Sequence, residues 1–244
     1  MVIDATGLDH RQLNVRIRAA LADGQRILEL THVNGQRYIA AGLRDQAEII
    51  VNGVAGNDLA AFMDGPTIIV KANAQDAVGN TMNAGKVVVH GDARDVIGYA
   101  MRGGRIFIKG DVGYRVGIHM KSYQDQVPAV VIGGRAMDFL GEYMAGGILV
   151  LLGLNGAGAH PIAGSYTGTG MHGGAIYLRG QLADHMLGKE VKSFGLDDND
   201  KKVVDGLLQE FFVHFAAGSG AVDLKDIVKL VPVSHRPYGR LYAY

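Results

Sequence analysis

Cysteine and tryptophan are absent from this 244-residue chain, and proline occurs only five times. Without cysteine the chain can form no disulfide, no thiolate zinc site and no iron–sulfur cluster on its own side chains. The 24 basic and 24 acidic residues cancel, so no net charge favours nucleic acid or an anionic membrane as a partner. The longest apolar run, Ile148–Leu152, is far shorter than the roughly 20 residues that span a bilayer. We therefore expect a cytoplasmic protein with no secretion signal or membrane anchor.

Glycine, by contrast, is abundant: 36 of 244 residues, about twice its usual share of roughly 7%. Many glycines belong to one recurring pattern, in which Gly-x-x-Met is followed by a glycine turn and three apolar residues. Its clearest copy lies within Gly91–Gly110. A pattern that recurs at this frequency indicates a structural repeat. The repeat residues are Gly79, Met82, Gly98, Met101, Gly104, Gly117, Met120, Gly141, Met144, Gly147, Gly168, Met171 and Gly174.

The length of the repeat decides between two architectures. The apolar triplets follow one another at steps of 22, 19, 19, 19, 24, 19 and 27 residues. A propeller blade needs four strands in about 40 residues or more, whereas 19 residues suffice for one turn of a parallel β-helix. We therefore predict an all-β core, a right-handed parallel β-helix (solenoid) of about seven to eight coils. The triplets begin at Ile27, Ile49, Ile68, Val87, Ile106, Val130, Leu149 and Ile176.

Equivalent positions stack in such a coil, so the first and third residues of each triplet are expected to face the interior. The middle residue should then face outward, yet it is apolar on every coil. An outer apolar column must be covered by another element. The middle residues are Leu28, Ile50, Ile69, Val88, Phe107, Val131, Val150 and Tyr177.

The two ends of the chain offer candidate covers around a solenoid spanning residues 26–180. Residues 1–25 are expected to form an N-terminal capping helix, because Asp9 and Gln12 resemble a capping box before an apolar stripe. Residues 181–244 should contain a helix that covers the outer column, followed by an extended tail.

The pattern of that second helix is apolar on a wide face from Val203 to Phe215, after the acidic pair Asp197-Asp198. The tail, Val231–Tyr244, has two prolines and three tyrosines. It is expected to pack on the solenoid or on a partner.

Few residues suggest chemistry of their own. The loop Gly153–Gly158 lacks both the spacing and the following helix of a phosphate-binding motif, which favours a surface loop. The nine histidines include no H-x-x-x-H pair, so no metal site is predicted. We therefore assign no catalytic, cofactor-binding or metal-binding residue to this chain.

Two sets of stacked side chains have alternative interpretations. Asp76, Asp95 and Asp138 could pair as carboxylates or form a calcium ladder, but each is expected to bond the backbone of its own turn. The basic residues at the strand exits form a stripe that either keeps an edge soluble or docks an acidic partner. The stripe comprises Lys71, His90, Lys109 and Arg179.

Two insertions interrupt the repeat. The 24- and 27-residue steps place extra residues at Lys121–Gln126 and Leu154–Thr167. Loops that project from a repeat array commonly form its binding surface, so we expect partner contacts there.

The multi-copy repeat, clearest at Gly91–Gly110, resembles the GXGXG domain, the C-terminal β-helix of the glutamate synthase large subunit. The same domain type occurs as one subunit of formylmethanofuran dehydrogenase and in N-methylglutamate synthase. The resemblance implies a stand-alone, non-catalytic subunit of a split, archaeal-type glutamate synthase, which makes glutamate from glutamine and 2-oxoglutarate. Its implied partners are a glutamine amidotransferase subunit and an FMN-binding synthase subunit.

The resemblance also implies that FMN and the Fe–S clusters are bound by those partner subunits and that this chain holds no cofactor. The alternatives are a subunit of the formylmethanofuran dehydrogenase or N-methylglutamate synthase type, and a free-standing enzyme or ligand-binding solenoid. A homo-oligomer is possible in each case.

Overall fold

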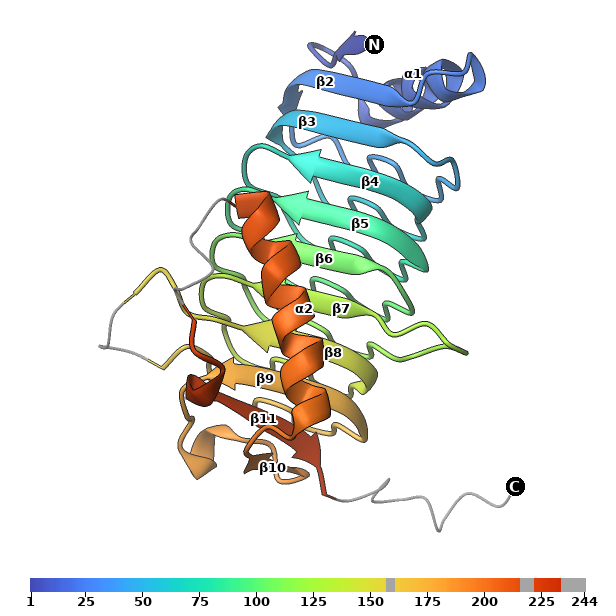
Figure 1. Ribbon diagram of the computed structural model, residues 1–244. Helices are drawn as coiled ribbons and strands as arrows, with labels where there is room; N and C mark the ends of the chain where they lie inside the picture. Colours follow the sequence, from blue (N-terminus) through green and yellow to red (C-terminus); the bar gives the residue numbers. More distant parts are fainter. Residues whose placement is uncertain (157–160, 216–221, 234–244) are drawn as a thin grey trace, which may run out of the picture.

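A stack of short parallel strands forms the body of the molecule in the computed structural model, which describes residues 1–156, 161–215 and 222–233 (Figure 1). One helix lies at the N-terminal end and another along the side of the stack. The predicted tail falls largely outside the described residues. In chain order the elements are β1 (Val2–Asp4), α1 (His10–Ala22), β2 (Ile27–Asn34), β3 (Glu48–Val54), β4 (Asp64–Val70), β5 (Ala84–Val89), β6 (Arg105–Ile108), β7 (Ala129–Ile132), β8 (Ala145–Leu151), β9 (Gly173–Arg179), η1 (Asp184–Met186), β10 (Val191–Phe194), α2 (Asp198–Phe215), η3 (Leu224–Asp226) and β11 (Ile227–Pro232).

The strands form one 11-stranded sheet in which β1 to β9 pair in parallel and in chain order, followed by β11 and β10. Successive coils place Val88 opposite Phe107 and Phe107 opposite Val131. The predicted parallel β-helix is thus confirmed. The solenoid has about six turns, slightly fewer than the seven to eight predicted, because the prediction counted strands rather than complete turns.

The inner columns were assigned correctly from β3 onward but not in β2. Ile27 is 60% exposed, whereas Leu28 and Leu30 are fully buried. The pairing register places Leu28 opposite Ile49 and Leu30 opposite Val51. The prediction that Ile27 faces the core was therefore wrong by one residue. A shift of one residue exchanges the two faces of a strand, so Glu29, rather than Leu28, occupies the outer column.

Helix α1 closes the N-terminal end of the core. Asp9 accepts from the backbone N–H groups of Arg11 and Gln12, and the Gln12 side chain accepts from the Asp9 N–H, which confirms the capping box. The buried stripe Leu13, Ile17 and Leu21 joins the same hydrophobic cluster as the inner columns. Strand β1, which the sequence pattern did not indicate, adds a parallel strand to β2.

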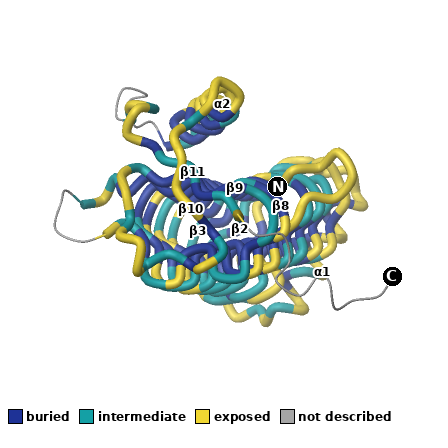
Figure 2. The backbone as a smooth tube through the Cα atoms, turned by 90° about the horizontal axis from the view of Figure 1, so that it is seen from below, coloured by how far each residue is buried: buried dark blue, intermediate teal, exposed yellow. Residues whose placement is uncertain are grey.

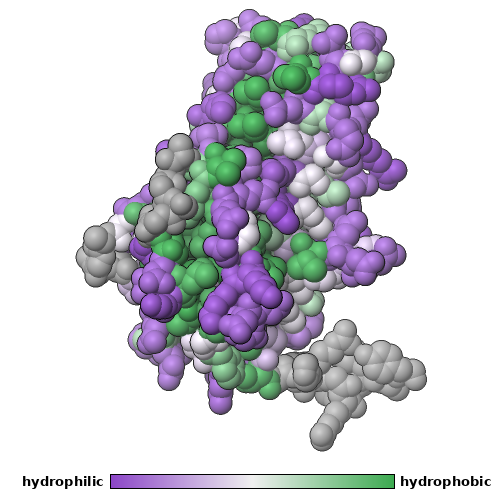
Figure 3. All heavy atoms as spheres, in the orientation of Figure 1, coloured by the Kyte–Doolittle hydropathy of each residue, from purple (hydrophilic) through white to green (hydrophobic). Residues whose placement is uncertain are grey.

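Helix α2 covers the outer apolar column from β5 to β9, as predicted. Figure 2 views the stack from its end and shows α2 beside the coils rather than within them. Its buried face, which includes Leu207, Phe211 and Phe215, forms a second cluster with Val88 and Phe107. Hydrophobic side chains lie along the margins of α2, while polar ones occupy its outward face (Figure 3).

Two buried or half-buried carboxylates attach α2 to the sheet. Asp200 accepts from the Tyr177 hydroxyl at 2.7 Å and from Lys229 Nζ at 2.9 Å. Further along the helix, Glu210 pairs with Lys86 at 2.5 Å and with Arg105. Because each carboxylate is compensated by partners on the strands, the helix has a fixed position on the sheet.

Candidate interaction surface

One side of each coil consists of turns rather than strands, and we call this side the turn face. In residues 95–101, Val96, Gly98 and Ala100 have φ angles of 54°, 69° and 50°, so alternate residues are left-handed. The N–H of Val96 donates to the following coil, while the N–H of Gly98 donates to the preceding one. Neighbouring turns are therefore hydrogen-bonded in both directions, which gives the turn face a regular and rigid backbone.

The repeat glycines of the turn face lie against the core. A Cβ on Gly141 would lie 2.5 Å from Ile176 Cδ1, and one on Gly79 would lie 2.4 Å from Ile106 Cδ1. Glycine is favoured at these positions because the backbone is left-handed and because no space exists for a side chain. The glycines with positive φ in this column are Gly79, Gly98, Gly117, Gly141 and Gly168.

The repeat methionines fill the interior between coils. Met82, Met101, Met120, Met144 and Met171 are all buried. A Cβ on Gly104 would lie 2.5 Å from Met82 Cε, so the glycine turn of one coil makes room for the methionine of the preceding coil. The equivalent pairs are Met120 with Gly147 and Met144 with Gly174.

The stacked aspartates bond to the next coil, and the prediction that each bonds its own turn was wrong. Asp76 Oδ1 accepts from the N–H of Asp95 at 3.2 Å, and Asp95 Oδ1 accepts from that of Tyr114 at 2.9 Å. Asp138 Oδ1 accepts from Ser165 N–H at 2.8 Å. In a solenoid the adjacent coil is only about 4.8 Å away, so its backbone N–H groups are within reach of each carboxylate.

A second ladder of the same kind runs along a neighbouring column. Asn73 Oδ1 accepts from Asp92 N–H at 2.9 Å, and Asp92 Oδ1 accepts from Asp111 N–H at 2.9 Å. Asp111 Oδ1 then accepts from Arg135 N–H at 2.7 Å. An amide and a carboxylate make the same bond, so this column needs an acceptor rather than a charge.

Exposed and half-buried side chains, aromatic or charged, form two rows on the turn face, which together we call the turn-face ladder. It consists of Tyr99, Arg115, His119, Phe139, Tyr143 and Tyr166. Tyr143 stacks on His119 with ring centroids 5.4 Å apart, and His119 meets Tyr99 edge-on at 6.0 Å. Tyr99, Tyr143 and Tyr166 are 39%, 46% and 54% exposed. Aromatic side chains held in contact on a rigid backbone are well suited to protein contacts, because little ordering entropy is lost on binding.

A charged pair lies at the centre of the ladder. The Arg115 guanidinium carbon lies 4.5 Å from the centre of the Phe139 ring, and Arg115 donates to Glu142, whose side chain is buried. Phe139 also stacks on Tyr166 at 5.0 Å. These contacts form a second row, which joins side chains of three consecutive coils.

The two predicted insertions border the ladder on opposite sides. The insertion Lys121–Gln126 begins two residues after His119. Ser122 Oγ accepts from Gly147 N–H at 3.1 Å, which ties this loop to the next coil. The other insertion, Leu154–Thr167, ends at the ladder, and its residues 157–160 lie outside the described part. In Figure 1 the loop before β7 and the chain after β8 leave the stack on opposite sides. The predicted binding region is therefore adjacent to the ladder.

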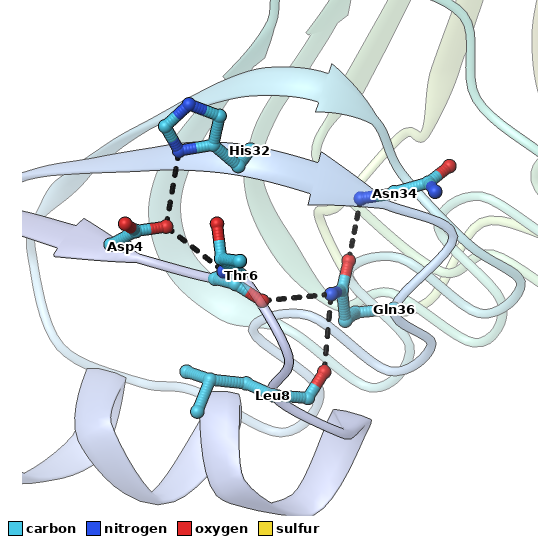
Figure 4. A network of polar contacts seen from close by, with 7 residues as sticks. Asp4, Thr6, Leu8, His32, Asn34 and Gln36 are labelled. Carbon is cyan, nitrogen blue, oxygen red and sulfur yellow. Dashed lines mark hydrogen bonds and ion pairs between the residues drawn. The ribbon is translucent and has the colours of Figure 1, made fainter.

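A polar network fixes the N-terminal end of the stack (Figure 4). Asp4 Oδ1 accepts from Thr6 N–H at 2.9 Å and lies 3.1 Å from His32 Nδ1. The Gln36 side chain accepts from Asn34 N–H at 2.7 Å and donates to two carbonyl groups before α1. An open hollow of about 780 Å³ adjoins these residues. Their hydrogen bonds hold the chain between β1 and α1 against the end of β2, which is a structural role.

The histidines and the stacked aspartates do not form a metal site in the described part of the chain. There, no three His, Cys, Asp or Glu side chains lie close enough together to hold an ion. His160 and His235 lie outside the described residues. The basic stripe does stack, with Lys71 Nζ 3.4 Å from His90 Nε2, and it lies beside the end of α2, where His90 packs edge-on against Phe215. No described helix is long and apolar enough to span a bilayer.

Sequence reasoning found the repeat but missed the turn-face ladder. A signal was present, because Phe62, His119 and Tyr143 occupy the same position, two residues after the repeat glycine or its alanine equivalent. All three have positive φ, which is uncommon for bulky residues. Thr81 and Ala100, at the equivalent position of the coils between them, also have positive φ. The backbone of this column is therefore left-handed for large and small side chains alike, which indicates that the adjacent coils fix it.

Comparisons with known proteins agree with this architecture. The family model for the GXGXG motif matches residues 9–232. An uncharacterized protein of Methanocaldococcus jannaschii is 46% identical over 255 residues, covering 99% of this chain and 96% of the relative.

A solved structure is similar in fold. It belongs to the formyltransferase/hydrolase complex FhcABCD of Methylorubrum extorquens, determined with methylofuran. The TM-score is 0.63 at 20% identity, and the match covers 95% of this chain and 96% of that one. This likeness extends over nearly all of both chains.

Proposed function

Because the chain belongs to the GXGXG motif family, we propose that it is a non-catalytic assembly subunit of a cytoplasmic multi-subunit oxidoreductase complex. The observation that carries this proposal is the turn-face ladder, in which exposed aromatic rings contact one another on a rigid stack. Aromatic side chains gathered on a surface are typical of protein–protein contact sites.

For the finer assignment, we propose a glutamate synthase-like complex that transfers nitrogen from glutamine to 2-oxoglutarate. The repeat of Gly91–Gly110 supports this assignment through its resemblance to the glutamate synthase β-helix. The partners would be a glutamine amidotransferase subunit and an FMN-binding synthase subunit. This chain contains no cysteine and supplies no thiolate ligand, so the partners would hold any Fe–S cluster together with the FMN.

A second candidate is a subunit of a formylmethanofuran dehydrogenase-type complex. The observation in its favour is the similarity, over 95% of this chain, to a chain from the formyltransferase/hydrolase complex. Both candidates assign the same structural role to this chain and differ in the partners that bind it.

Reconstitution with defined subunits tests the proposal. The purified chain would be mixed with the amidotransferase and FMN-binding subunits of its own source organism, and separately with the corresponding formyltransferase/hydrolase subunits. Mass would be measured by light scattering during gel filtration. Co-elution with the first set supports the glutamate synthase-like assignment, and co-elution with the second set supports the alternative. Elution alone in both mixtures, with substrate turnover by the chain itself, would contradict an assembly role.

A further inference from the structure

A column of basic residues borders the turn-face ladder, and we call it the basic edge: Arg102, Lys121 and His172. Their backbone N–H groups donate to methionine carbonyls of the preceding coils, so the three occupy equivalent positions. Ala145 occupies the position between Lys121 and His172. The basic edge therefore runs parallel to the ladder, and Arg102 and Lys121 lie three residues after Tyr99 and two residues after His119.

Two members of the basic edge, Arg102 and Lys121, carry positive charge that no described carboxylate pairs with. Among the residues that the structure describes, neither Arg102 nor Lys121 forms a salt bridge, and the buried Nε of Arg102 has no hydrogen-bond partner. The adjoining loop adds a single carboxylate, that of Asp125. Elsewhere, Arg105 and Lys229 pair with carboxylates, whereas the side chains of Arg102 and Lys121 remain available to a partner.

The ladder itself adds little net charge. Glu142 pairs with Arg115 within it. The other margin of the turn face carries the carboxylates of Asp95 and Asp138, each of which accepts a backbone N–H. The centre of the surface is thus aromatic, with basic side chains on one margin and carboxylates on the other. Interfaces with an apolar centre and a charged rim are oriented by the charges of the rim.

We infer that the turn face docks a partner protein whose contact surface is apolar at its centre and bears Asp or Glu carboxylates where it meets Arg102 and Lys121. The inference rests on the proposed assembly role and goes beyond it by naming the surface and the chemistry of its partner. The aromatic rings supply most of the buried apolar area, and the basic edge determines the orientation and speeds association.

Matched substitutions in one column test the aromatic part. Tyr143 and Phe62 have the same position in the coil and both have left-handed backbone, with 46% and 58% exposure, but Phe62 lies outside the ladder. The probes are the purified amidotransferase, FMN-binding and formyltransferase/hydrolase subunits, titrated by calorimetry. Tyr143→Ser should weaken the binding of the true partner about tenfold or more, a hot-spot effect, while Phe62→Ser should leave the affinity within about twofold.

Charge reversal tests the basic edge. Lys121→Glu should slow association and reduce its dependence on ionic strength, whereas Lys192→Glu, on the exposed strand β10, should change neither. The role of the turn face is overturned if the wild type binds a probe and both Tyr143→Ser and Lys121→Glu bind it equally well, although the assembly role would stand. It is also overturned if Tyr143→Ser abolishes self-association instead of partner binding. Failure of the wild type to bind any probe would contradict the assembly role itself.

Discussion

The Cα of Gly141 faces the side chain of Ile176 so closely that a Cβ would lie 2.5 Å from the Ile176 Cδ1 atom. Gly141→Ala would combine a left-handed alanine with overpacking of the core, which together cost about 2 to 5 kcal/mol. Gly42→Ala is the matched control, because Gly42 has φ of 63° and a Cβ there would meet no atom within 4 Å. Gly42→Ala should lower the free energy of unfolding only by the cost of a left-handed alanine, about 1 to 2 kcal/mol. Chemical denaturation of both variants measures the difference, and equal losses would show that the contact with Ile176 is unimportant.

The hydrogen bond from Asp111 N–H to Asp92 Oδ1 should survive the loss of the Asp92 charge but not the loss of its side-chain oxygen. Asp92→Asn keeps an acceptor for Asp111 N–H, as Asn73 does natively, and should change the unfolding free energy by only a few tenths of a kcal/mol. Asp92→Ala leaves that N–H without its partner and should cost about 1 kcal/mol. If the asparagine variant were the less stable of the two, the carboxylate charge would matter more than the hydrogen bond.

Much of this fold is predictable from the sequence because the coil repeats. Each triplet of apolar residues is set between glycines, and the periodicity alone indicates the stack and its inner columns. The wrong predictions occur where the spacing of residues along the chain does not determine which residue pairs with which. In β2 the first coil has no preceding triplet to set its register, and at Asp76 the acceptor bonds a residue 19 positions away. The turn-face ladder escaped prediction because exposure and ring stacking depend on contacts between coils.

The corrected register of β2 has a direct test in two adjacent residues. Leu28→Asp would place a carboxylate in the core and should destabilise the protein by several kcal/mol or prevent folding, because a buried charge lacks a partner. Ile27→Asp should change stability by about 0.5 kcal/mol or less, since Ile27 is 60% exposed. Thermal unfolding of the two variants distinguishes the registers. A larger loss for Ile27→Asp would restore the column that begins at Ile27.

Acid should weaken the attachment of α2. Burial, reinforced by Lys71 and Lys109, lowers the pKa of His90, and burial together with Lys86 lowers that of His214, although Glu210 opposes the latter shift. Because the folded state disfavours protonation of both rings, their contribution to the free energy of unfolding is complete above about pH 6.5. It declines as the pH falls below that value and through the lowered pKa values.

The carboxylate attachment responds at lower pH. Burial raises the pKa of Glu210, but hydrogen bonds from Lys86 and Arg105 outweigh burial and place it below its usual range. The resulting stabilisation is present above about pH 4.5 and is lost as the pH falls through the lowered pKa. Melting temperatures from pH 7.5 to pH 3.5 should therefore fall in two stages. A His90→Gln/His214→Gln double variant should lose the first stage only, and an unchanged first stage would exclude these histidines as its cause.

The assembly role itself is tested most directly by native mass spectrometry of the complex that forms when this chain, tagged, is co-expressed with its candidate partner subunits. The proposed assembly role predicts this chain in fixed integer stoichiometry with an FMN-binding or formyltransferase/hydrolase subunit, and a loss of that species for Tyr143→Ser but not for Phe62→Ser. A wild-type spectrum that contains only the free chain, together with turnover of substrate by that free chain, would contradict the account.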